Sequence, residues 1–342
     1  MATKVVTFGE IMLRLSTPGY ERFVQAKQFD VNYGGGEANV AVSLAHFGLD
    51  SCYVTRLPKN DIGDAAENEL RRYGVNTEHV LRGGERLGIY FLETGASQRA
   101  SKVVYDRSHS AIAEVAPGMV NWEKTLEGAQ WFHITGITPA LSASAAQATI
   151  EAVAAARKKG VTVSCDLNYR KKLWTREQAE KTMTQVMQNV DVAIANEEDA
   201  EMVFGIKAGA TDVHAGKLDT AKYQSVAEQL MKKFPTLKKV AVTLRESLSA
   251  SDNNWSAVLW DGSKFYQSRK YAIRVVDRVG GGDAFGAGLI YSLVSGKAAQ
   301  DALEFAVAAS CLKHTIPGDF NHVSVAEVDA HIKEGGSGRV QR

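Results

Sequence analysis

The sequence predicts an α/β fold of three layers, in which helices flank a mainly parallel central sheet and a small β-sheet lies apart. Short apolar runs alternate with helical segments along most of the 342 residues, as in parallel strands joined by helices. Two glycine clusters each lead directly into a helical run. Short alternating segments within 11–33 and 86–110 interrupt this rhythm, so we expect them to form the small sheet, which would suit a movable lid.

The first strand is predicted at 5–8, and Gly9 separates it from an alternating run at 11–15. A glycine between two strands indicates that the chain leaves one sheet and enters the other. Further strands are predicted at 29–33, 52–55, 88–92, 102–105, 131–134, 161–165, 192–195 and 240–244, with a hairpin at 257–266. Helices are predicted from the first glycine cluster to 47, to about 73 before Gly74, at 142–159, 175–188 and 220–234, from the second glycine cluster to 294, at 301–313 and from 325.

The domain organisation is predicted to be simple. Residues 1–334 are expected to form one domain, with an insertion loop at 205–218 and a frayed tail at 335–342. No internal repeat, low-complexity tract or interdomain linker divides the sequence.

Charge and cysteine content exclude several classes of protein. Lys and Arg total 40 against 39 Asp and Glu, so a net charge of +1 provides no field to attract nucleic acid or an anionic membrane. There is no uninterrupted apolar run of about 18 residues. Cys52, Cys165 and Cys311 are odd in number and widely spaced, which favours buried thiols over disulfides or a metal site. A cytoplasmic protein without nucleic-acid or membrane partners is expected.

The C-terminal glycine cluster predicts a phosphate site. Gly280, Gly281 and Gly282 allow the backbone to approach a ligand closely, and the helix that follows offers free amides and the positive end of its dipole. Asp283 stands at the mouth of this site, where its carboxylate would repel phosphate unless it accepts a proton from an attacking hydroxyl. The alternative is an ordinary glycine-rich loop with Asp283 as a helix cap.

The N-terminal glycine cluster predicts a site for a hydroxylated ligand. Gly34, Gly35 and Gly36 feed a helix whose first turn carries Glu37, Ala38 and Asn39. Polar side chains and free amides meet in such a turn. A capped core helix without a ligand is the alternative.

Polar residues follow two predicted strands at their carboxyl ends, where open α/β sheets bind ligands. Asp166, Asn168 and Arg170 follow the strand at 161–165, and Asn196 and Asp199 follow the strand at 192–195. The carboxylates of the second group would hold Mg²⁺ through its water shell, or they begin a solvated helix.

The two glycine motifs, in this order and about 240 residues apart, resemble those of the ribokinase-like (PfkB) carbohydrate kinases over nearly the whole chain. The resemblance implies a ribokinase-like fold in which 34–41 bind the sugar. It also implies that Gly280, Gly281 and Gly282 form the anion hole and that Asp283 is the catalytic base. Gly281 replaces the usual alanine, and Asp199 stands where the family has glutamate.

Within this family, the run 166–174 and the Gly-Glu-Ala-Asn form of the first motif are similar to the 2-keto-3-deoxygluconate kinases. The resemblance implies that ATP phosphorylates 2-dehydro-3-deoxy-D-gluconate to its 6-phosphate. The implied sugar-acid contacts are Gly34, Tyr90, Tyr105, Arg107, Arg170 and Asp319. The implied contacts of ATP and Mg²⁺ are Asp166, Asn168, Arg170, Asn196, Leu244, Gly280 and Gly282, with Asp199 near the metal.

Three alternatives compete with a sugar-acid kinase. A fructokinase or other neutral-sugar kinase needs no cation, whereas Arg107 and Arg170 suit a carboxylate. A dinucleotide-dependent oxidoreductase would carry a G-x-G-x-x-G turn after its first strand, which this chain lacks. A non-catalytic sugar sensor would have no use for Asp283. The open edges of the small sheet predict a homo-oligomer paired through it.

Overall fold

The computed structural model describes residues 2–196, 198–207 and 220–335. Its central sheet has six parallel strands, confirming a mainly parallel sheet. In spatial order they are β4 (Asp50–Val54), β1 (Lys4–Phe8), β9 (Ala129–Thr135), β10 (Thr162–Asp166), β11 (Val192–Asn196) and β12 (Lys239–Ser247). Antiparallel strands extend it beyond β12, namely β13 (Asp252–Trp260), β14 (Phe265–Gln267) and β15 (Tyr271–Arg274).

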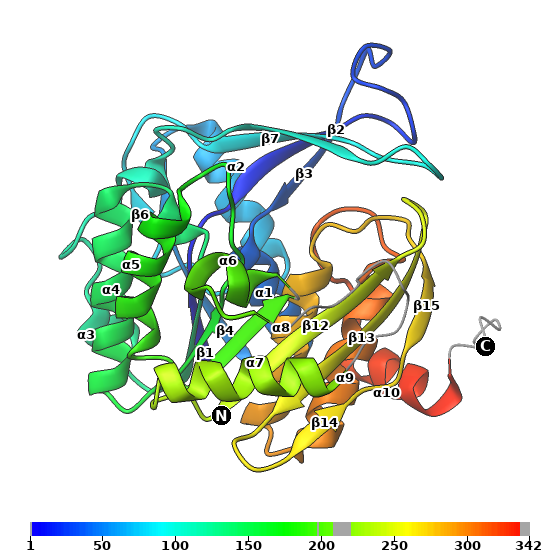
Figure 1. Ribbon diagram of the computed structural model, residues 1–342. Helices are drawn as coiled ribbons and strands as arrows, with labels where there is room; N and C mark the ends of the chain where they lie inside the picture. The colour runs from blue at the N-terminus through cyan, green and yellow to red at the C-terminus, as the bar shows by residue number, and fades with distance from the viewer. Residues whose placement is uncertain (1, 197, 208–219, 336–342) are drawn as a thin grey trace.

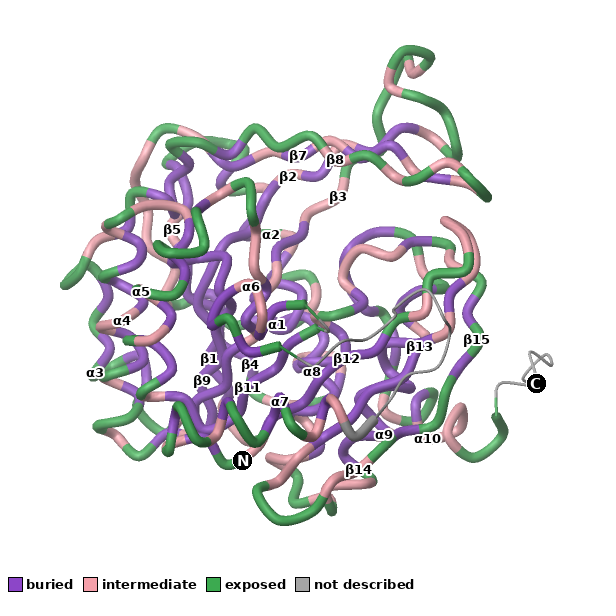
Figure 2. The backbone as a smooth tube through the Cα atoms, in the orientation of Figure 1, coloured by how far each residue is buried: buried purple, intermediate pink, exposed green. Residues whose placement is uncertain are grey.

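Helices cover both faces of this sheet (Figure 1). One face packs on α4 (Ala143–Lys158), α5 (Arg176–Met187) and α7 (Thr220–Lys233), and the other on α1 (Gly36–His46), α8 (Gly281–Val294) and α9 (Ala299–Lys313), with α10 (Val325–Glu334) beyond. Successive strand side chains point to opposite faces. In β1, Val6 and Phe8 therefore join one core and Val5 the other. Figure 2 shows this burial through the centre of the sheet.

The remaining described elements are short or peripheral. Helix α2 (Asp61–Arg72) packs through Ala66 and Leu70 with residues of α1 and β4. The short elements are β5 (Arg56–Leu57), β6 (Leu81–Arg82), α3 (Trp122–Thr125), α6 (Asp199–Phe204) and the 3₁₀ helices η1 (Ala111–Glu114) and η2 (Thr138–Ala140).

A second, four-stranded sheet lies across the top of the molecule in Figure 1, and we refer to it as the small sheet. Its order is β3 (Asp30–Gly34), β2 (Met12–Ser16), β7 (Gly88–Glu93) and β8 (Lys102–Asp106). These strands come from the two segments predicted to leave the main rhythm, and Gly9 lies where the chain passes between sheets. The separate small sheet is therefore confirmed.

The C-terminal part of the central sheet is longer than predicted. Strands β12 and β13 pair over residues 240–247 and 253–260, although the polar segment 245–254 carries no apolar alternation. The predicted hairpin at 257–266 is confirmed, since Trp260 pairs with Phe265 across a turn that contains Asp261 and Gly262. The predicted insertion loop lies outside the described residues at 208–218, and so does the predicted tail at 336–342.

The predicted state of the cysteines is confirmed, because Cys52, Cys165 and Cys311 are all buried and free. Among the described helices, none has the length and apolar character needed to cross a membrane.

Candidate active site

A cavity of about 420 Å³ lies at the carboxyl ends of β10 and β11, where polar residues were predicted to gather. Tyr90 and Tyr105 of the small sheet line its other side. A more open cavity of about 730 Å³ adjoins it and shares Tyr105 and Arg170. The predicted site residues that line the first cavity are Gly35, Gly36, Asn39, Tyr90, Tyr105, Arg107, Asp166, Asn168, Arg170, Asn196, Asp199, Gly280, Gly282, Asp283 and Asp319.

The glycine turn before α8 is shaped by its close neighbours. Gly280 adopts φ 83°, and a Cβ there would lie 2.0 Å from the Asp319 carbonyl oxygen. A Cβ on Gly281 would lie 2.4 Å from the His314 ring, so alanine does not fit here without movement of that ring. A Cβ on Gly282 would meet nothing within 4 Å. The turn is therefore packed behind and open toward the cavity at the start of a helix, which suits an anion.

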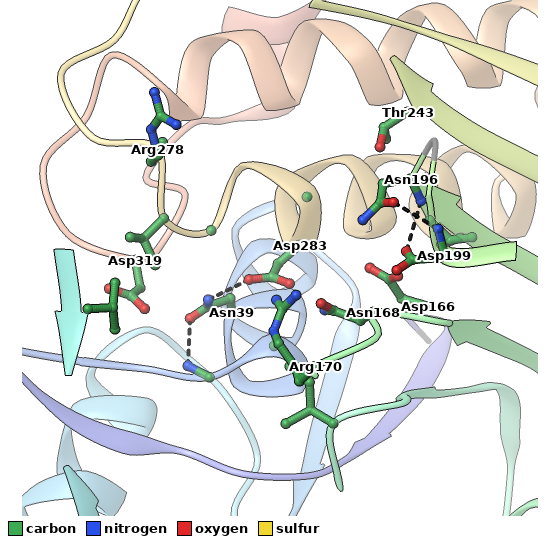
Figure 3. A pocket seen from close by; sticks show the side chains of 18 of the residues that line it. Asn39, Asp166, Asn168, Arg170, Asn196, Asp199, Thr243, Arg278, Asp283 and Asp319 are labelled. Atoms are coloured by element: carbon green, nitrogen blue, oxygen red, sulfur yellow. Dashed lines mark hydrogen bonds between the residues drawn. The ribbon is translucent and has the colours of Figure 1, made fainter. Parts of the chain in front are cut away.

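Asp283 faces the first turn of α1 across the cavity (Figure 3). Asn39 Nδ2 donates to Asp283 Oδ2 at 2.6 Å, and Asn39 Oδ1 accepts from the Gly35 amide at 3.2 Å. Loss of solvation raises the pKa of Asp283 to about 6, against the smaller lowering effect of the Asn39 hydrogen bond. A carboxylate with this pKa is a suitable proton acceptor near neutral pH.

Asp166, Asn196 and Asp199 form the opposite corner of the cavity (Figure 3). The Asp199 carboxylate is fixed because Oδ1 accepts from the Tyr169 amide and Oδ2 from the Asn196 amide, both at 3.0 Å. Burial raises the pKa of Asp166 well above its usual value, and the charges of Asp199 and Asp283 raise it further. A nearby cation would relieve this repulsion.

The donor set of this corner fits Mg²⁺, which prefers carboxylate and amide oxygens and keeps several waters. Within the described ranges, no group of three or more His, Cys, Asp or Glu side chains could hold a metal by itself. An ion here would therefore take its remaining ligands from water and phosphate.

Arg170 extends into the cavity near Asp283 and Asn168 (Figure 3). Its Nη1 donates to the Tyr169 carbonyl at 3.4 Å. Its charge lowers the pKa of Asp283 and of Asp199, although burial dominates both values. No ion pair to Arg170 is found in the described part of the chain, so its guanidinium can receive an anionic ligand.

Arg107 is buried beside the small sheet and is paired with Glu10. Its Nη2 donates to Glu10 Oε2, while Ser110 Oγ donates to Glu10 Oε1 at 3.3 Å. Arg107 Nε has no hydrogen-bond partner among the described residues. Sequence reasoning missed Glu10, whose only local signal was an acid directly after a buried strand.

Asp319 lines the cavity, but its carboxylate is already engaged by protein groups. Arg14 donates to Asp319 Oδ1 at 2.7 Å and to Asp277 Oδ2 at 2.5 Å. Tyr90 Oη donates to Asp319 at 2.6 Å. The predicted role of Asp319 as a direct sugar contact thus competes with this buried network. The sequence did not reveal Arg14, which lies 305 residues from Asp319.

Five predicted site residues do not line the cavity. The Glu37 carboxylate is buried and accepts hydrogen bonds from Thr135 and Thr138, so it braces α1 instead of facing a ligand. Burial raises the pKa of Glu37 to about 7. The other four are packed into the protein, where a substrate cannot reach their side-chain positions; they are Gly34, Ala38, Leu244 and Gly281.

Leu244 was expected to contact the nucleotide, but it does not line the cavity. Its neighbours in β12 do. Thr243 and Arg245 line the cavity, together with Trp255 and Arg278. Trp255 Nε1 is buried and has no partner in the described residues. Strand alternation explains the difference, because Leu244 points into the core between two residues that face the other way.

Comparison with known proteins agrees with this geometry. The chain is 52% identical to a 2-dehydro-3-deoxygluconokinase from Thermotoga maritima, whose crystal structure matches with a TM-score of 0.93 over 97% of this chain and 99% of that one. It is 31% identical to a 2-dehydro-3-deoxygalactonokinase of Haloferax volcanii over 99% of each chain. It is 26% identical to a 2-dehydro-3-deoxygluconokinase of Bacillus subtilis, covering 96% of this chain and 94% of that one.

The model of the pfkB family of carbohydrate kinases matches residues 2–323, which include both glycine turns and the cavity between them. Because that match extends over nearly the whole chain, this protein belongs to the pfkB carbohydrate kinase family.

Proposed function

We propose that this protein transfers the γ-phosphoryl group of ATP to 2-dehydro-3-deoxy-D-gluconate, giving the 6-phosphate and ADP. The observation that carries the proposal is that Arg107 and Arg170 line the same cavity as Asp283. The arginines can bind the carboxylate of a substrate, and the Asp283 carboxylate in the same cavity can accept a proton from its hydroxyl group. The names of the Thermotoga and Bacillus relatives support the same substrate.

In this mechanism Asp283 accepts the proton of the 6-hydroxyl group as its oxygen bonds to the γ-phosphorus. The bond from that phosphorus to the oxygen it shares with the β-phosphate breaks, and ADP carries the electron pair away. The amides of Gly280 and Gly282, which line the cavity, stabilise the charge that develops on the phosphoryl oxygens, whereas the Gly281 amide donates to the Arg278 carbonyl at 3.3 Å. Asn39 holds the Asp283 carboxylate toward the substrate through its 2.6 Å hydrogen bond.

The nucleotide is proposed to extend from the glycine turn toward Thr243, Arg245 and Arg278, which line the same cavity. Mg²⁺ would supply positive charge that neutralises the phosphates. Asp199, with Asp166 and Asn196 beside it, is proposed to orient the waters of that ion. The fixed hydrogen bonds of Asp199 suit this indirect role.

The two arginines differ in the charge that they offer to a substrate. Glu10 neutralises Arg107 in a buried pair, leaving Nε of Arg107 for a hydrogen bond. Arg170 has no carboxylate partner among the described residues and is proposed to read the substrate carboxylate. A neutral sugar would leave this guanidinium without its anion, which disfavours a fructokinase. The galactonate epimer is a second candidate, because the Haloferax relative is named for it.

The test is release of ADP by the purified enzyme with 2-dehydro-3-deoxygluconate, its galactonate epimer, fructose, ribose and adenosine. We expect the highest kcat/KM with one or both of the keto acids and little turnover of the others. A preference for fructose or ribose would reject the sugar-acid assignment. A preference for adenosine would reject sugar phosphorylation altogether.

We also propose that residues 1–334 act as one domain with the small sheet as its lid, and that two copies pair through that lid. Its strands β3 and β8 are edges, and Val31 and Val104 on them are 60% and 52% exposed. Open edges with apolar side chains favour pairing with another chain. Sedimentation of wild type and of Val104→Asp would test this pairing, and equal masses of the two proteins would contradict it.

Free, buried thiols support the cytoplasm as the compartment of this protein.

A further inference from the structure

The last residue of α9, Lys313, is fully buried directly behind the glycine turn. Its Nζ donates to the Ile316 carbonyl at 3.1 Å and lies 3.5 Å from the Asp277 carbonyl oxygen. In the described part of the chain it forms no ion pair. Burying an ammonium group is costly, so a lysine in this position has a role that an apolar residue of similar size cannot fill.

The contacts of Lys313 converge on the turn that ends at Gly280. Asp277 begins this turn, and its carboxylate accepts from the amides of Val279 and Gly318, both at 3.0 Å. A Cβ on Gly280 would lie only 3.2 Å from Lys313 Cε, so the lysine stem forms the floor of the turn. The ammonium group thus joins the segment before α8 to the segment after α9.

We infer that Lys313 is a positioning residue of the kinase, whose ammonium group fixes the turn at 277–280 and so aims the first amides of α8 at the transferred phosphoryl group. This inference rests on the proposed function. An amide displaced from the phosphoryl oxygens stabilises the transition state less, although ATP is still bound by its other contacts. Loss of Lys313 should therefore lower kcat more than it weakens ATP binding.

The surroundings of Asp283 give a second readout. The groups that face it are Asn39, Asp319, Arg170 and Lys313, and both cations lower its pKa while Asp319 raises it. Lys313 is itself surrounded by Asp277, Asp319, Arg14 and Asp283. Removing the ammonium charge should therefore raise the pKa of Asp283, whereas a purely structural loss would leave this value in place.

The experiment compares Lys313→Met, which keeps the volume, with Lys313→Ala, which leaves room for a small cation. Lys297→Met is the matched control, since Lys297 packs on the Phe305 ring of the same helix at 4.3 Å but lies away from the cavity. We expect kcat to fall about 10- to 100-fold in both Lys313 variants, with the KM for ATP within about threefold. The control should keep the wild-type kcat.

Two further results are expected. Added ammonium or methylammonium should restore part of the kcat of Lys313→Ala, and leave wild type and Lys313→Met unchanged. Carbon-13 NMR of the Asp283 carboxyl group, assigned with Asp283→Asn, should titrate at higher pH in Lys313→Met than in wild type.

Circular dichroism and melting curves must first establish that the variants are folded. A folded Lys313→Met with near-normal kcat would overturn the inference. So would an unchanged Asp283 titration together with no recovery by ammonium, because the lysine would then be structural only. The NMR titration requires no turnover, and failure of the proposed substrate appears in the wild-type assay, so the two proposals fail separately.

Discussion

Asp283 shows how the surroundings of one residue set its chemistry. The ordinary pKa of an aspartate in water is 3.8, which makes it a weak base, whereas burial beside the cavity raises the pKa of this one to about 6. Asn39 directs one carboxylate oxygen and leaves the other for a substrate. The same residue that is a helix-start acid in the sequence is thus a suitable base in the fold.

Replacing Asp283 by asparagine keeps its size and removes the proton acceptor. We expect kcat to fall by about 10²- to 10⁴-fold, because general base catalysis contributes about that much. Binding of ATP, measured by calorimetry, should change little. Turnover close to wild type would show that another group accepts the proton.

The activity should depend on pH through this same carboxyl group. Asp283 accepts a proton only when it is ionised, so kcat/KM should decrease as the pH falls through about 6 and level off above it. The Asn39 hydrogen bond lowers this pKa. Asn39→Ala should therefore move the acid limb to higher pH in a kcat/KM profile, and a shift to lower pH would contradict the assignment.

Arg170 is expected to decide which class of sugar is phosphorylated. Arg170→Lys keeps the charge but loses the two parallel N–H donors, and kcat/KM for the keto acid should fall about 10- to 100-fold. Arg170→Ala should cost more. Fructose serves as the control substrate, and its residual turnover should barely change. Equal losses on both substrates would assign carboxylate recognition elsewhere, with Arg107 as the next candidate.

Among the elements, the small sheet is joined to the rest of the molecule by buried polar contacts beside the cavity, including those of Arg14 and Tyr90 with Asp319. Arg107 and Tyr90 reach from its end into buried hydrogen bonds, whereas β8 is largely exposed. A sheet held in this way can move about its connection to the main body, and closure over a substrate would exclude water from the phosphoryl group.

Hydrogen exchange should reveal this closure. We expect the amides of 11–33 and 86–110 to exchange more slowly when ATP analogue and sugar acid are both bound, because closure orders these strands. The strands of the central sheet serve as the internal reference. Exchange in the small sheet that is the same with and without ligands would indicate a fixed sheet.

The elements that the sequence predicted well are those with a local signal. Each glycine turn is followed by the start of a helix within a few residues, and each parallel strand is visible in the sequence as a short apolar run. Strand β2 was harder, since Leu13 and Leu15 suggest one buried face, but Met12, Arg14 and Ser16 are the buried side chains. The carboxylates that pair with Arg14 belong to Asp277 and Asp319, near the far end of the chain, and no local sequence pattern predicts these pairs.

Strands β12 and β13 were predicted too short for a related reason. Residues such as Asn253 and Asn254 have low strand propensity, and their strand conformation depends on pairing with Glu246, Ser247 and β15. The Glu10–Arg107 pair likewise joins residues 97 positions apart. Motifs were therefore predictable, whereas ion pairs and the polar ends of β12 and β13 required the tertiary structure.

At the scale of the whole molecule, Arg14 connects the beginning of the chain to its end. It pairs with Asp277 and Asp319 while almost entirely buried. Removing one partner of a buried ion network leaves charges without compensation and costs about 3 to 5 kcal/mol.

Arg14→Met should therefore lower the free energy of unfolding by about 3 to 5 kcal/mol in a urea titration. Arg274→Met is the matched control, because Arg274 is 84% exposed and lies 3.8 Å from Asp252. Such a surface pair contributes about 0 to 1 kcal/mol. Equal stability of the two variants would mean that the buried network contributes no more than the surface pair.

The Arg14–Asp319 contact also determines at which point of its synthesis the chain can first complete its fold. At about 5 to 20 residues per second, the ribosome needs roughly 15 to 60 seconds to add Asp319 after the first glycine turn. Throughout that interval Arg14 lacks a carboxylate that its buried position requires. A nascent or prematurely ended chain therefore carries the first glycine turn without a finished cavity, and catalysis begins only when translation is almost complete.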